Sequence, residues 1–513
     1  MFSKIFRLVT IIAVIATTFA FAPTAFAGSN SCDTRVNNTQ AKLLECVTLE
    51  GVREHQAELQ AIADANNGIR TSGTPGFDAS KDYVVETMTA AGYNVTVQPF
   101  TFQTFIILTP TILEQVAPLP AGPIVTNIMS YSGSGDVTAA VSTPAGILGC
   151  AAADWAGFPA GNIALVRRGA CTFAAKATNA YNAGAVGVII YNSIPGTLNG
   201  TLGATFSLNI GVTSVTNAQG LALAALVPGG LTMRLKTDTF RGQATTYNIF
   251  AETKDGDPNN VIMAGAHLDS VNAGPGINDN VSGTAALLEV AQQMAKVKPR
   301  NLVRFAWWGA EESGLVGSTY YVNNLSQEEK DRITLYLNFD MIGSPNHVFF
   351  IYDGDDSDVF GAGPGPAGSA EIEKTFEAFF NMRDIAFKGT DFSGRSDYGP
   401  FIAVGIPSGG LFTGAEGIKT AAEAAEPDWG GTAGQQYDGC YHLACDTYTN
   451  NNNFALDINS DAVAFAILQY AMNTSDINGA KGKGNFPPVS GVGGQPGNGS
   501  QEGLHDDHPL LTE

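Results

Sequence analysis

Three apolar runs in the second half of the chain each lead into a side chain that can bind a metal ion. The runs are Val261–Ala266, Leu302–Trp308 and Leu335–Phe339. Short apolar runs between stretches of helical periodicity indicate buried parallel strands. Ligands of an open α/β sheet bind outside the carboxyl ends of its strands, so one sheet edge should collect the residues that follow these runs. Those residues are His267, the adjacent Glu311 and Glu312, and Asp340.

Two further residues extend this set of candidate metal ligands. Asp279 lies just before a predicted helix, Thr284–Val297, and taken alone it is explained as a helix cap. His442 lies in a short segment between Cys440 and Cys445. Clustered buried charge is costly unless something neutralises it. Two histidines and three carboxylates can hold two metal ions with one carboxylate bridging, and such nitrogen and oxygen ligands suit zinc.

Neighbouring residues suggest how the candidate ligands are supported. Asp269 follows His267 by two residues, and a metal-bound imidazole usually donates its other N–H to a carboxylate or a carbonyl. Glu311 and Glu312 are adjacent, so their side chains should point in different directions. One of them can therefore bind metal while the other faces the substrate. A pair of surface glutamates is the alternative, but the apolar run Phe305–Trp308 leads directly into them.

The overall composition limits the classes of partner. The 513 residues exceed one domain, and a hydrophobic fraction of 44% allows a large core. The chain has 27 Lys and Arg against 48 Asp and Glu, a formal net charge of −21. This acidic balance argues against nucleic-acid binding through a basic surface.

The first 27 residues have the pattern of a secretion signal. Lys4 and Arg7 precede an apolar stretch, Leu8–Ala22, and Ala25-Phe26-Ala27 fits a signal-peptidase site. A membrane anchor is the alternative, but the stretch is short for a spanning helix and no other long apolar run follows. We expect a secreted, extracellular protein that begins near Gly28 and has no membrane partner.

Six cysteines in an exported chain favour disulfide bonds. Proximity in the sequence groups them as Cys32–Cys46, Cys150–Cys171 and Cys440–Cys445. The third pair would close a tight loop around Tyr441 and His442, and so hold both side chains in place.

The composition of the sequence and its strand and helix patterns predict four segments after the signal peptide. Strand and helix patterns alternate through residues 241–475, and residues 28–126 would supply the N-terminal part of the same α/β domain. Residues 127–240 are rich in Gly, Ala, Val and Thr. Residues 476–513, rich in Gly, Pro, Asn and Gln, are predicted to be a flexible tail that can be removed. We expect a mixed, mostly parallel central sheet flanked by helices, with a small β-rich insert.

The insert resembles the protease-associated domain, a module found within exported peptidases. The resemblance rests on residues 161–173, which are followed by a predicted helix, Ala174–Ala183, and a strand, Val186–Asn192. The segment contains no cluster of catalytic residue types. Substrate access, partner contact and a passive insert all remain open as its role.

Taken together and in order, the motifs of the main part resemble the exported bacterial di-zinc aminopeptidases of the leucyl aminopeptidase type. The resemblance spans about residues 50–475, interrupted by the insert, and Ser393–Tyr398 and Gly409–Gly414 extend it. The motifs are His267-x-Asp269, Asn278-Asp279-Asn280-x-Ser282-Gly283, Glu311-Glu312-x-Gly314, Asn338-x-Asp340-Met341 and Tyr441-His442.

This resemblance implies a role for each candidate ligand. His267 and Asp340 would bind one Zn²⁺, and Glu312 and His442 the other. Asp279 would bridge both ions, and its peptide bond to Asn280 is expected to be cis.

The resemblance also implies the catalytic and substrate-binding residues. Glu311 would be the general base, and Tyr441 would donate a hydrogen bond to the developing oxyanion. Phe412 and the backbone of Gly394 and Arg395 would line the pocket for the first side chain. The substrate's free amine would lie near Glu311, Asp340 and the Arg395 carbonyl. The expected substrates are peptides and proteins with a free N-terminus and a large apolar first residue such as leucine, and the expected state is a monomer.

Three other functions on this fold stay open at this point. A di-zinc carboxypeptidase would need basic groups for the substrate carboxylate, and Arg395 is the one obvious candidate near the motifs. A glutaminyl cyclase would need only one zinc, and a binding protein would have lost its metals. The full set of candidate ligands argues against the last two. Asp457 and Asp461 have the spacing of a helical calcium site in this family, with surface charge as the alternative.

Overall fold

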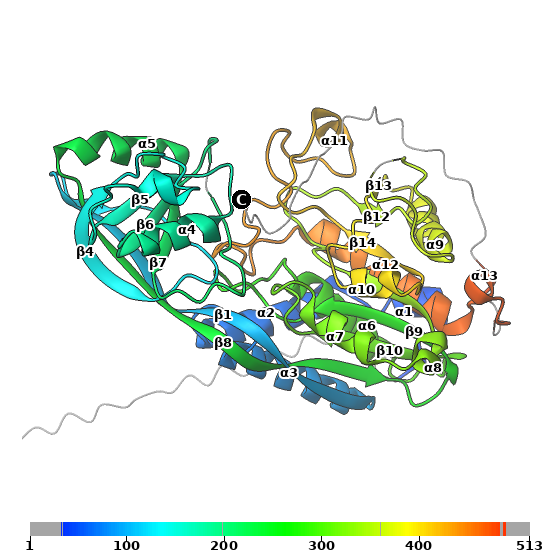
Figure 1. Cartoon of the computed structure of the whole chain (residues 1–513). Coiled ribbons are helices and arrows are strands. Elements are labelled where there is room, and N and C mark those ends of the chain that lie inside the picture. The colour runs from blue at the N-terminus through cyan, green and yellow to red at the C-terminus, as the bar shows by residue number, and fades with distance from the viewer. Residues whose placement is uncertain (1–31, 33, 197, 360, 483–485, 489–513) are drawn as a thin grey trace, which may run out of the picture.

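The computed structural model describes residues 32–488, except for residues 33, 197, 360 and 483–485 (Figure 1). The predicted signal peptide and the last part of the predicted tail lie outside the described residues. Among the residues described, no helix is both long and apolar enough to cross a membrane.

The larger part of the molecule is built on a mixed, mostly parallel sheet with strand order β13-β12-β14-β11-β9-β10-β8. Parallel pairs join β9 to β10, β9 to β11, β11 to β14 and β12 to β13. Antiparallel pairs join β10 to β8 and β12 to β14. The bounds are β8 (Thr232–Glu252), β9 (Asp257–His267), β10 (Asn301–Trp308), β11 (Ile333–Phe339), β12 (Phe350–Tyr352), β13 (Lys388–Thr390) and β14 (Ser408–Phe412).

Helices cover both faces of this sheet, as the sequence predicts. The first face carries α1 (Gln40–Leu44), α2 (Leu49–Ala65), α3 (Pro75–Ala91), α6 (Val281–Met294), α9 (Ser369–Arg383) and α12 (Asn453–Met472). The opposite face carries α7 (Val316–Asn324), α8 (Gln327–Arg332) and α10 (Gly399–Ala403). Because both faces are covered, the central strands are apolar on both sides and are almost wholly buried.

A long pair of antiparallel strands joins the main part to the insert. β1 (Asn94–Ala117) pairs with β8 from Asn94↔Glu252 to Ala117↔Thr232. One end of β8 continues the main sheet beside β10, and its other end pairs with β4 (Gly135–Ser142) of the insert. The two parts therefore share continuous strands (Figure 1).

The insert has its own strands and its own core. β3 (Asn127–Ile128), β5 (Ile163–Arg167), β6 (Gly187–Tyr191) and β7 (Gly211–Val215) continue from β4, with helices α4 (Phe173–Asn182) and α5 (Asn217–Leu226). Phe173, Val188 and Val212 are among its fully buried residues. β2 (Gly122–Pro123) pairs with β1 near the start of the insert.

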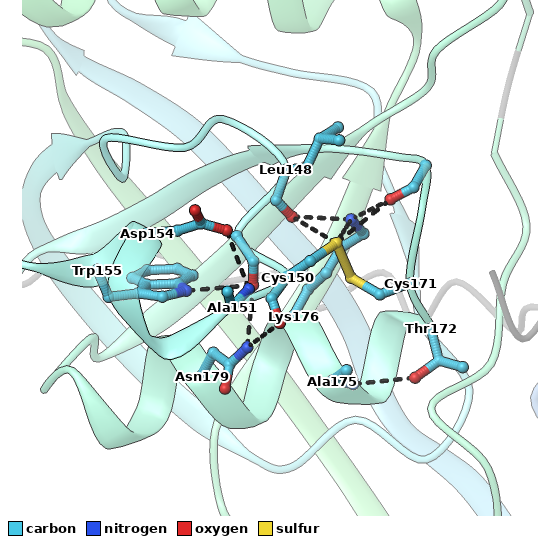
Figure 2. Close-up of a disulfide and its surroundings, with 12 residues drawn as sticks. Leu148, Cys150, Ala151, Asp154, Trp155, Cys171, Thr172, Ala175, Lys176 and Asn179 are labelled. Atoms are coloured by element: carbon cyan, nitrogen blue, oxygen red, sulfur yellow. Dashed lines mark hydrogen bonds between the residues drawn. A yellow bond between two sulfur atoms is a disulfide. The ribbon is translucent and has the colours of Figure 1, made fainter.

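The structure contains the three disulfides that the sequence predicts, Cys32–Cys46, Cys150–Cys171 and Cys440–Cys445. The second of these lies in the insert, between the loop that follows Leu148 and the start of α4 (Figure 2).

The chain beyond α12 is described as far as Pro488, again with residues 483–485 omitted. α13 (Ser475–Asn478) is a short helix, and Phe486 packs against the main hydrophobic core. Gln469 and Asn473 donate hydrogen bonds to the carbonyls of Pro487 and Phe486, at 2.7 Å each. The first part of the predicted tail is therefore attached to the main part of the molecule.

Candidate metal centre

The candidate ligands follow strands whose ends lie side by side. Trp308 at the end of β10 is in register with His267 at the end of β9. Asn338 of β11 is in register with Gly265, so Asp340 emerges beside His267. This is the sheet edge that the three apolar runs predict, and all three strands deliver their polar residues to it.

His267 is buried and held in one orientation. Its Nδ1 lies 3.1 Å from the backbone carbonyl oxygen of Asp269, which accepts the N–H. The Nε2 atom then faces the carboxylates, at 3.1 Å from Asp279 Oδ1 and 3.4 Å from Asp340 Oδ1. A hydrogen bond at Nδ1 leaves Nε2 free for a metal ion.

His442 makes a second, similar group on the other side of Asp279. Its Nε2 lies 3.2 Å from Asp279 Oδ2 and 3.1 Å from Glu312 Oε2. The two oxygens of Asp279 therefore face two different imidazoles. This is the geometry expected of a carboxylate that bridges two metal ions.

Buried oxygens without a hydrogen bond indicate that the residues fit a cation. Among the described residues, Asp340 Oδ1 and Glu312 Oε1 have no hydrogen-bond partner, although both atoms are buried. A buried carboxylate oxygen left in this state is costly unless a positive charge reaches it. Two sets of ligand atoms lie close enough to share an ion: His267, Asp279 and Glu312 in one, and His267, Glu311 and Asp340 in the other.

The electrostatics of the site couple its histidines to its carboxylates. Burial alone would lower the pKa of both imidazoles, but Asp340 and Glu311 hold the pKa of His267 well above its usual value, and Glu312 and Asp279 do the same for His442. Burial raises the pKa of Glu312 to about 7 and that of Glu311 well above its usual value. Burial also opposes ionisation of Asp279, yet the two imidazoles hold its pKa below the usual range. Protons and a metal ion therefore compete for the same atoms.

Comparison with known proteins now identifies the family. The model for peptidase family M28 matches residues 248–467, and the model for the PA domain matches residues 134–223. An aminopeptidase of Pseudomonas aeruginosa is 48% identical over 461 residues, which cover 86% of this chain and 84% of the relative. The chain belongs to peptidase family M28.

Other relatives agree with this family membership. Leucine aminopeptidase 2 of Arthroderma otae is 43% identical over 82% of this chain and 83% of its own length. Among solved structures, an aminopeptidase from Aneurinibacillus sp. strain AM-1 has a TM-score of 0.60 at 28% identity, covering 84% of this chain and 96% of its own. A zinc aminopeptidase from Bacillus subtilis has a TM-score of 0.60 at 25% identity, covering 82% and 94%. This M28 peptidase is a zinc-dependent aminopeptidase with an inserted PA domain.

The structure refines two interpretations of residues beside the candidate ligands. The helix-cap alternative for Asp279 is wrong, because Asn280 caps α6 and its side-chain oxygen accepts the Gly283 N–H at 3.0 Å. Asp269 lies beside His267: its backbone carbonyl accepts the Nδ1–H at 3.1 Å, while its Oδ1 lies 3.7 Å from Nδ1 and accepts the Glu311 N–H at 3.1 Å. The peptide bond between Asp279 and Asn280 is cis, as the family resemblance implies.

The remaining predicted site residues surround this centre. The ring of Tyr441 stacks on that of His442 with centroids 3.8 Å apart, and burial raises the pKa of its phenol well above the usual value. Phe412 ends β14, next to Thr413, which donates its N–H to the Met341 carbonyl at 2.9 Å.

The loop that contains Gly394 and Arg395 is held by its neighbours. Gly394 donates its N–H to the Tyr398 hydroxyl at 2.8 Å, and Arg395 Nη2 lies 3.1 Å from Glu416 Oε1. The charges of Arg395 and Glu416 both act on the Tyr441 phenol. This loop therefore lies near the metal centre in space, although it is distant from His267 in the sequence.

Sequence reasoning missed three residues that support the ligands. Ser396 donates its hydroxyl to Asp340 Oδ2 at 2.5 Å. Asp446 accepts backbone N–H groups from the segment that carries Asp279, and Arg70 is fully buried behind the same segment. Ser396 lies in the motif Ser393–Tyr398, and Arg70 begins a segment rich in turn-forming residues, but no periodic pattern marks either residue. Asp446 has no signal beyond its place next to Cys445.

The predicted calcium residues lie on α12, away from these ligands. Asp461 forms an ion pair with Arg383, with Nη2 and Oδ2 2.5 Å apart. Burial raises the pKa of Asp461 to about 6 and that of Asp457 above its usual value. The Arg383 guanidinium thus already compensates part of this charge.

Proposed function

We propose that this M28 peptidase is a secreted, two-zinc aminopeptidase that prefers large apolar first residues such as leucine, with Glu311 as its general base. One observation carries the proposal: the two oxygens of Asp279 face His267 and His442 at 3.1 and 3.2 Å. The names of relatives such as leucine aminopeptidase 2 support the leucine preference. The predicted signal peptide and the three disulfides support secretion.

In this proposal, His267 and Asp340 would hold one zinc ion, Glu312 and His442 would hold the other, and Asp279 would offer one carboxylate oxygen to each. The unpartnered oxygens Asp340 Oδ1 and Glu312 Oε1 support this division, because each belongs to a different half of the site. Zinc bound there would lower the pKa of an attacking water and polarise the scissile carbonyl.

Glu311 accepts a proton from the attacking water and passes it to the leaving amine. Its side chain is 11% exposed, and its Oε2 lies 3.9 Å from His267 Nε2, so the carboxylate faces the candidate ligands. Its backbone N–H is fixed by Asp269, which restricts the direction of the side chain. Tyr441, kept protonated by its raised pKa, donates a hydrogen bond to the developing oxyanion.

The substrate is held at its free amino group and its first side chain. Glu311, Asp340 and the Arg395 carbonyl receive the amine, while Phe412 and the Gly394–Arg395 backbone line the side-chain pocket. The aromatic contact between Phe412 and Phe350, with centroids 6.0 Å apart, supports an apolar wall on this side.

We further propose that residues 127–240 act as one inserted unit, that residues 476–513 form a removable tail, and that the enzyme is a monomer without nucleic-acid or membrane partners. Calcium at Asp457 and Asp461 stays a prediction.

Release of leucine from leucyl-p-nitroanilide by the purified chain, with and without a chelator, tests the proposed function. We expect release that the chelator abolishes and that zinc restores, together with two zinc ions per chain by elemental analysis. Release of a C-terminal residue from a blocked peptide, or full activity with one zinc, would contradict the proposal.

A further inference from the structure

Arg70 lies behind the metal centre and is fully buried. Its guanidinium donates to the carbonyl of Leu268, to that of Pro275 at 2.9 Å and to that of Gly276 at 3.0 Å. Leu268 follows His267 directly, and Gly276 comes three residues before Asp279. One side chain therefore holds both ends of the loop 268–276, which separates these two candidate ligands.

The charge on Arg70 suits this position. Burial lowers its pKa to about 10, and the carboxylates of Asp269, Asp446 and Asp279 oppose that change. The guanidinium therefore stays charged at neutral pH. The rigid, planar guanidinium carries five N–H donors spread over three nitrogens, so it reaches three carbonyls that lie too far apart for a single ammonium nitrogen.

Asp446 holds the next part of the same loop. It accepts hydrogen bonds from the backbone N–H groups of the loop, whereas Arg70 donates to backbone carbonyls. Its Oδ1 accepts the Asn278 N–H at 2.8 Å, and its Oδ2 accepts the Asp279 N–H at 3.0 Å. Its backbone carbonyl accepts the Ile277 N–H at 3.1 Å. Asp446 also directly follows Cys445, whose disulfide closes the loop that carries His442.

We propose that Arg70 and Asp446 are positioning residues that together hold the loop 268–279 in the shape that zinc binding needs. The Arg70 guanidinium donates to carbonyls in the first part of the loop, 268–276. The Asp446 carboxylate accepts N–H groups from its last part, at Asn278 and Asp279. This inference rests on the proposed zinc ligands His267 and Asp279.

The packing around the loop leaves little room for another shape. Gly276 has a φ of +65°, and a Cβ there would lie 2.3 Å from the Asp279 carbonyl and 3.4 Å from Arg70 Nη2. Ser270 accepts the Arg70 N–H at 2.9 Å, and Thr71 donates to the Val271 carbonyl at 2.9 Å. The segment that starts at Arg70 thus runs along the loop.

The same segment also reaches the loop that follows β10. Ser72 accepts the Ala310 N–H at 2.7 Å, immediately before Glu311 and Glu312. Loss of Arg70 should therefore affect both halves of the metal centre and not His267 alone.

A matched control separates this role from general stabilisation. Arg304 is also largely buried and paired, with Nη2 2.5 Å from Glu252 Oε1, but it lies on β10 and its side-chain partners in the described part of the chain are Glu252 and Tyr321, outside the loop 268–279. Arg304→Met removes a buried, paired guanidinium from β10 of the main sheet and changes none of the candidate ligands. It should lower stability and leave zinc affinity unchanged.

The experiment measures the zinc dissociation constants of the metal-free full chain by competition with a fluorescent chelator. Arg70→Met, Arg70→Lys, Asp446→Asn and Arg304→Met are compared with the wild type, and the thermal unfolding of each metal-free form is recorded. We expect Arg70→Met to weaken zinc binding by about 10- to 100-fold, the range seen when partners of metal ligands are removed. At saturating zinc, kcat should fall more than KM changes.

The conservative variants keep the test decisive if Arg70→Met does not fold. Arg70→Lys and Asp446→Asn should each weaken zinc binding by about tenfold. The double variant should lose less than the product of the two effects, because both residues hold one loop. Wild-type zinc affinity in Arg70→Lys and Asp446→Asn, or an equal loss in Arg304→Met, would overturn the inference.

The wild type distinguishes failure of this inference from failure of the proposed function. If the unaltered chain binds fewer than two zinc ions, the proposed ligand set is wrong. If it binds two and the Arg70 and Asp446 variants bind them equally tightly, only the positioning role is wrong.

Discussion

The insert and the metal centre deal with buried charge in opposite ways. In the insert, the fully buried Lys176 donates to the carbonyls of Leu148 at 2.8 Å and Gly169 at 2.7 Å, and lies 3.5 Å from Cys150 Sγ (Figure 2). In the metal centre, Asp340 Oδ1 and Glu312 Oε1 are buried without a hydrogen-bond partner among the described residues. The protein itself satisfies the buried charge of Lys176, whereas several carboxylates that meet with unpaired oxygens form a candidate site for a cation.

The surroundings of the two sites explain this difference. Lys176 joins the loop before Cys150 to the start of α4 in a region closed by the Cys150–Cys171 disulfide. The carboxylates of the metal centre instead come from the ends of β10 and β11 and from the start of α6, and they repel one another where they meet. Only an added positive charge makes that arrangement favourable.

The largest expected effect is on catalysis. Glu311→Gln should lower kcat by about 10²- to 10⁴-fold, because it removes the proposed base without removing a proposed ligand. Zinc content, measured on the same sample, should stay at the wild-type value. Near-normal turnover by Glu311→Gln would show that another residue moves the proton.

A change at the adjacent residue should affect metal binding instead. Glu312→Ala removes the unpartnered Oε1 and the oxygen that lies 3.1 Å from His442, so zinc affinity should fall by at least about 100-fold. Chelator competition measures the loss. Tight binding of both zinc ions by Glu312→Ala would contradict its assignment as a ligand.

A change at Lys176 tests the structural half of the comparison. Lys176→Met leaves two buried carbonyls without a donor and should lower the free energy of unfolding by about 2–3 kcal/mol. Hydrogen exchange should speed up around Leu148 and Gly169, while turnover of leucyl-p-nitroanilide stays the same. The exposed Lys254→Met is the control. A loss of activity without faster exchange would mean that Lys176 acts on the active site.

The smallest expected effect concerns a buried group that stays neutral. Burial, together with the nearby Lys419 charge, lowers the pKa of His347 to about 4. The unfolded chain takes up this proton near pH 6.5 and the folded chain does not. Stability is therefore present above pH 6.5 and is lost as the pH falls toward 4, by about 2 kcal/mol at pH 5.

Denaturant unfolding at pH 7 and pH 5 checks this prediction. The wild type should lose stability between these values, and His347→Leu should lose about 2 kcal/mol less. His55, whose pKa burial also lowers to about 4, remains in both proteins and contributes equally to both losses. Identical pH dependence in the two proteins would mean that His347 is protonated in the folded state.

Much of the fold follows from local patterns. The apolar runs correspond to β9, β10 and β11. The apolar residues of Asp78–Ala91 have helical spacing, which predicts a helix, and this range falls within α3. Asn94–Phe102 alternates as a strand does, but it is only the first part of β1, which continues to Ala117. Its second half pairs with β8 and carries the insert, and a pairing partner so far along the chain leaves no local signal.

The contacts that support the metal centre could not be predicted from local sequence patterns, for a similar reason. Arg70 meets Leu268 across 198 positions, and Asp446 meets Asn278 across 168. Neither residue belongs to a periodic pattern or a short motif of known chemistry. Their role depends on which loops meet, and that is decided by strand order and helix packing.

The sequence by itself indicated which strands lead into candidate ligands, grouped the cysteines by proximity and carried the motifs of the family, because these follow from the order of residues along the chain. Only the tertiary structure decided that Asp279 lies between two imidazoles, that Asn280 and not Asp279 caps α6, and that a distant arginine and aspartate form hydrogen bonds with the segment between two candidate ligands. The physical reason is that buried polar atoms must find partners wherever the fold brings them, and those partners need not be near in sequence.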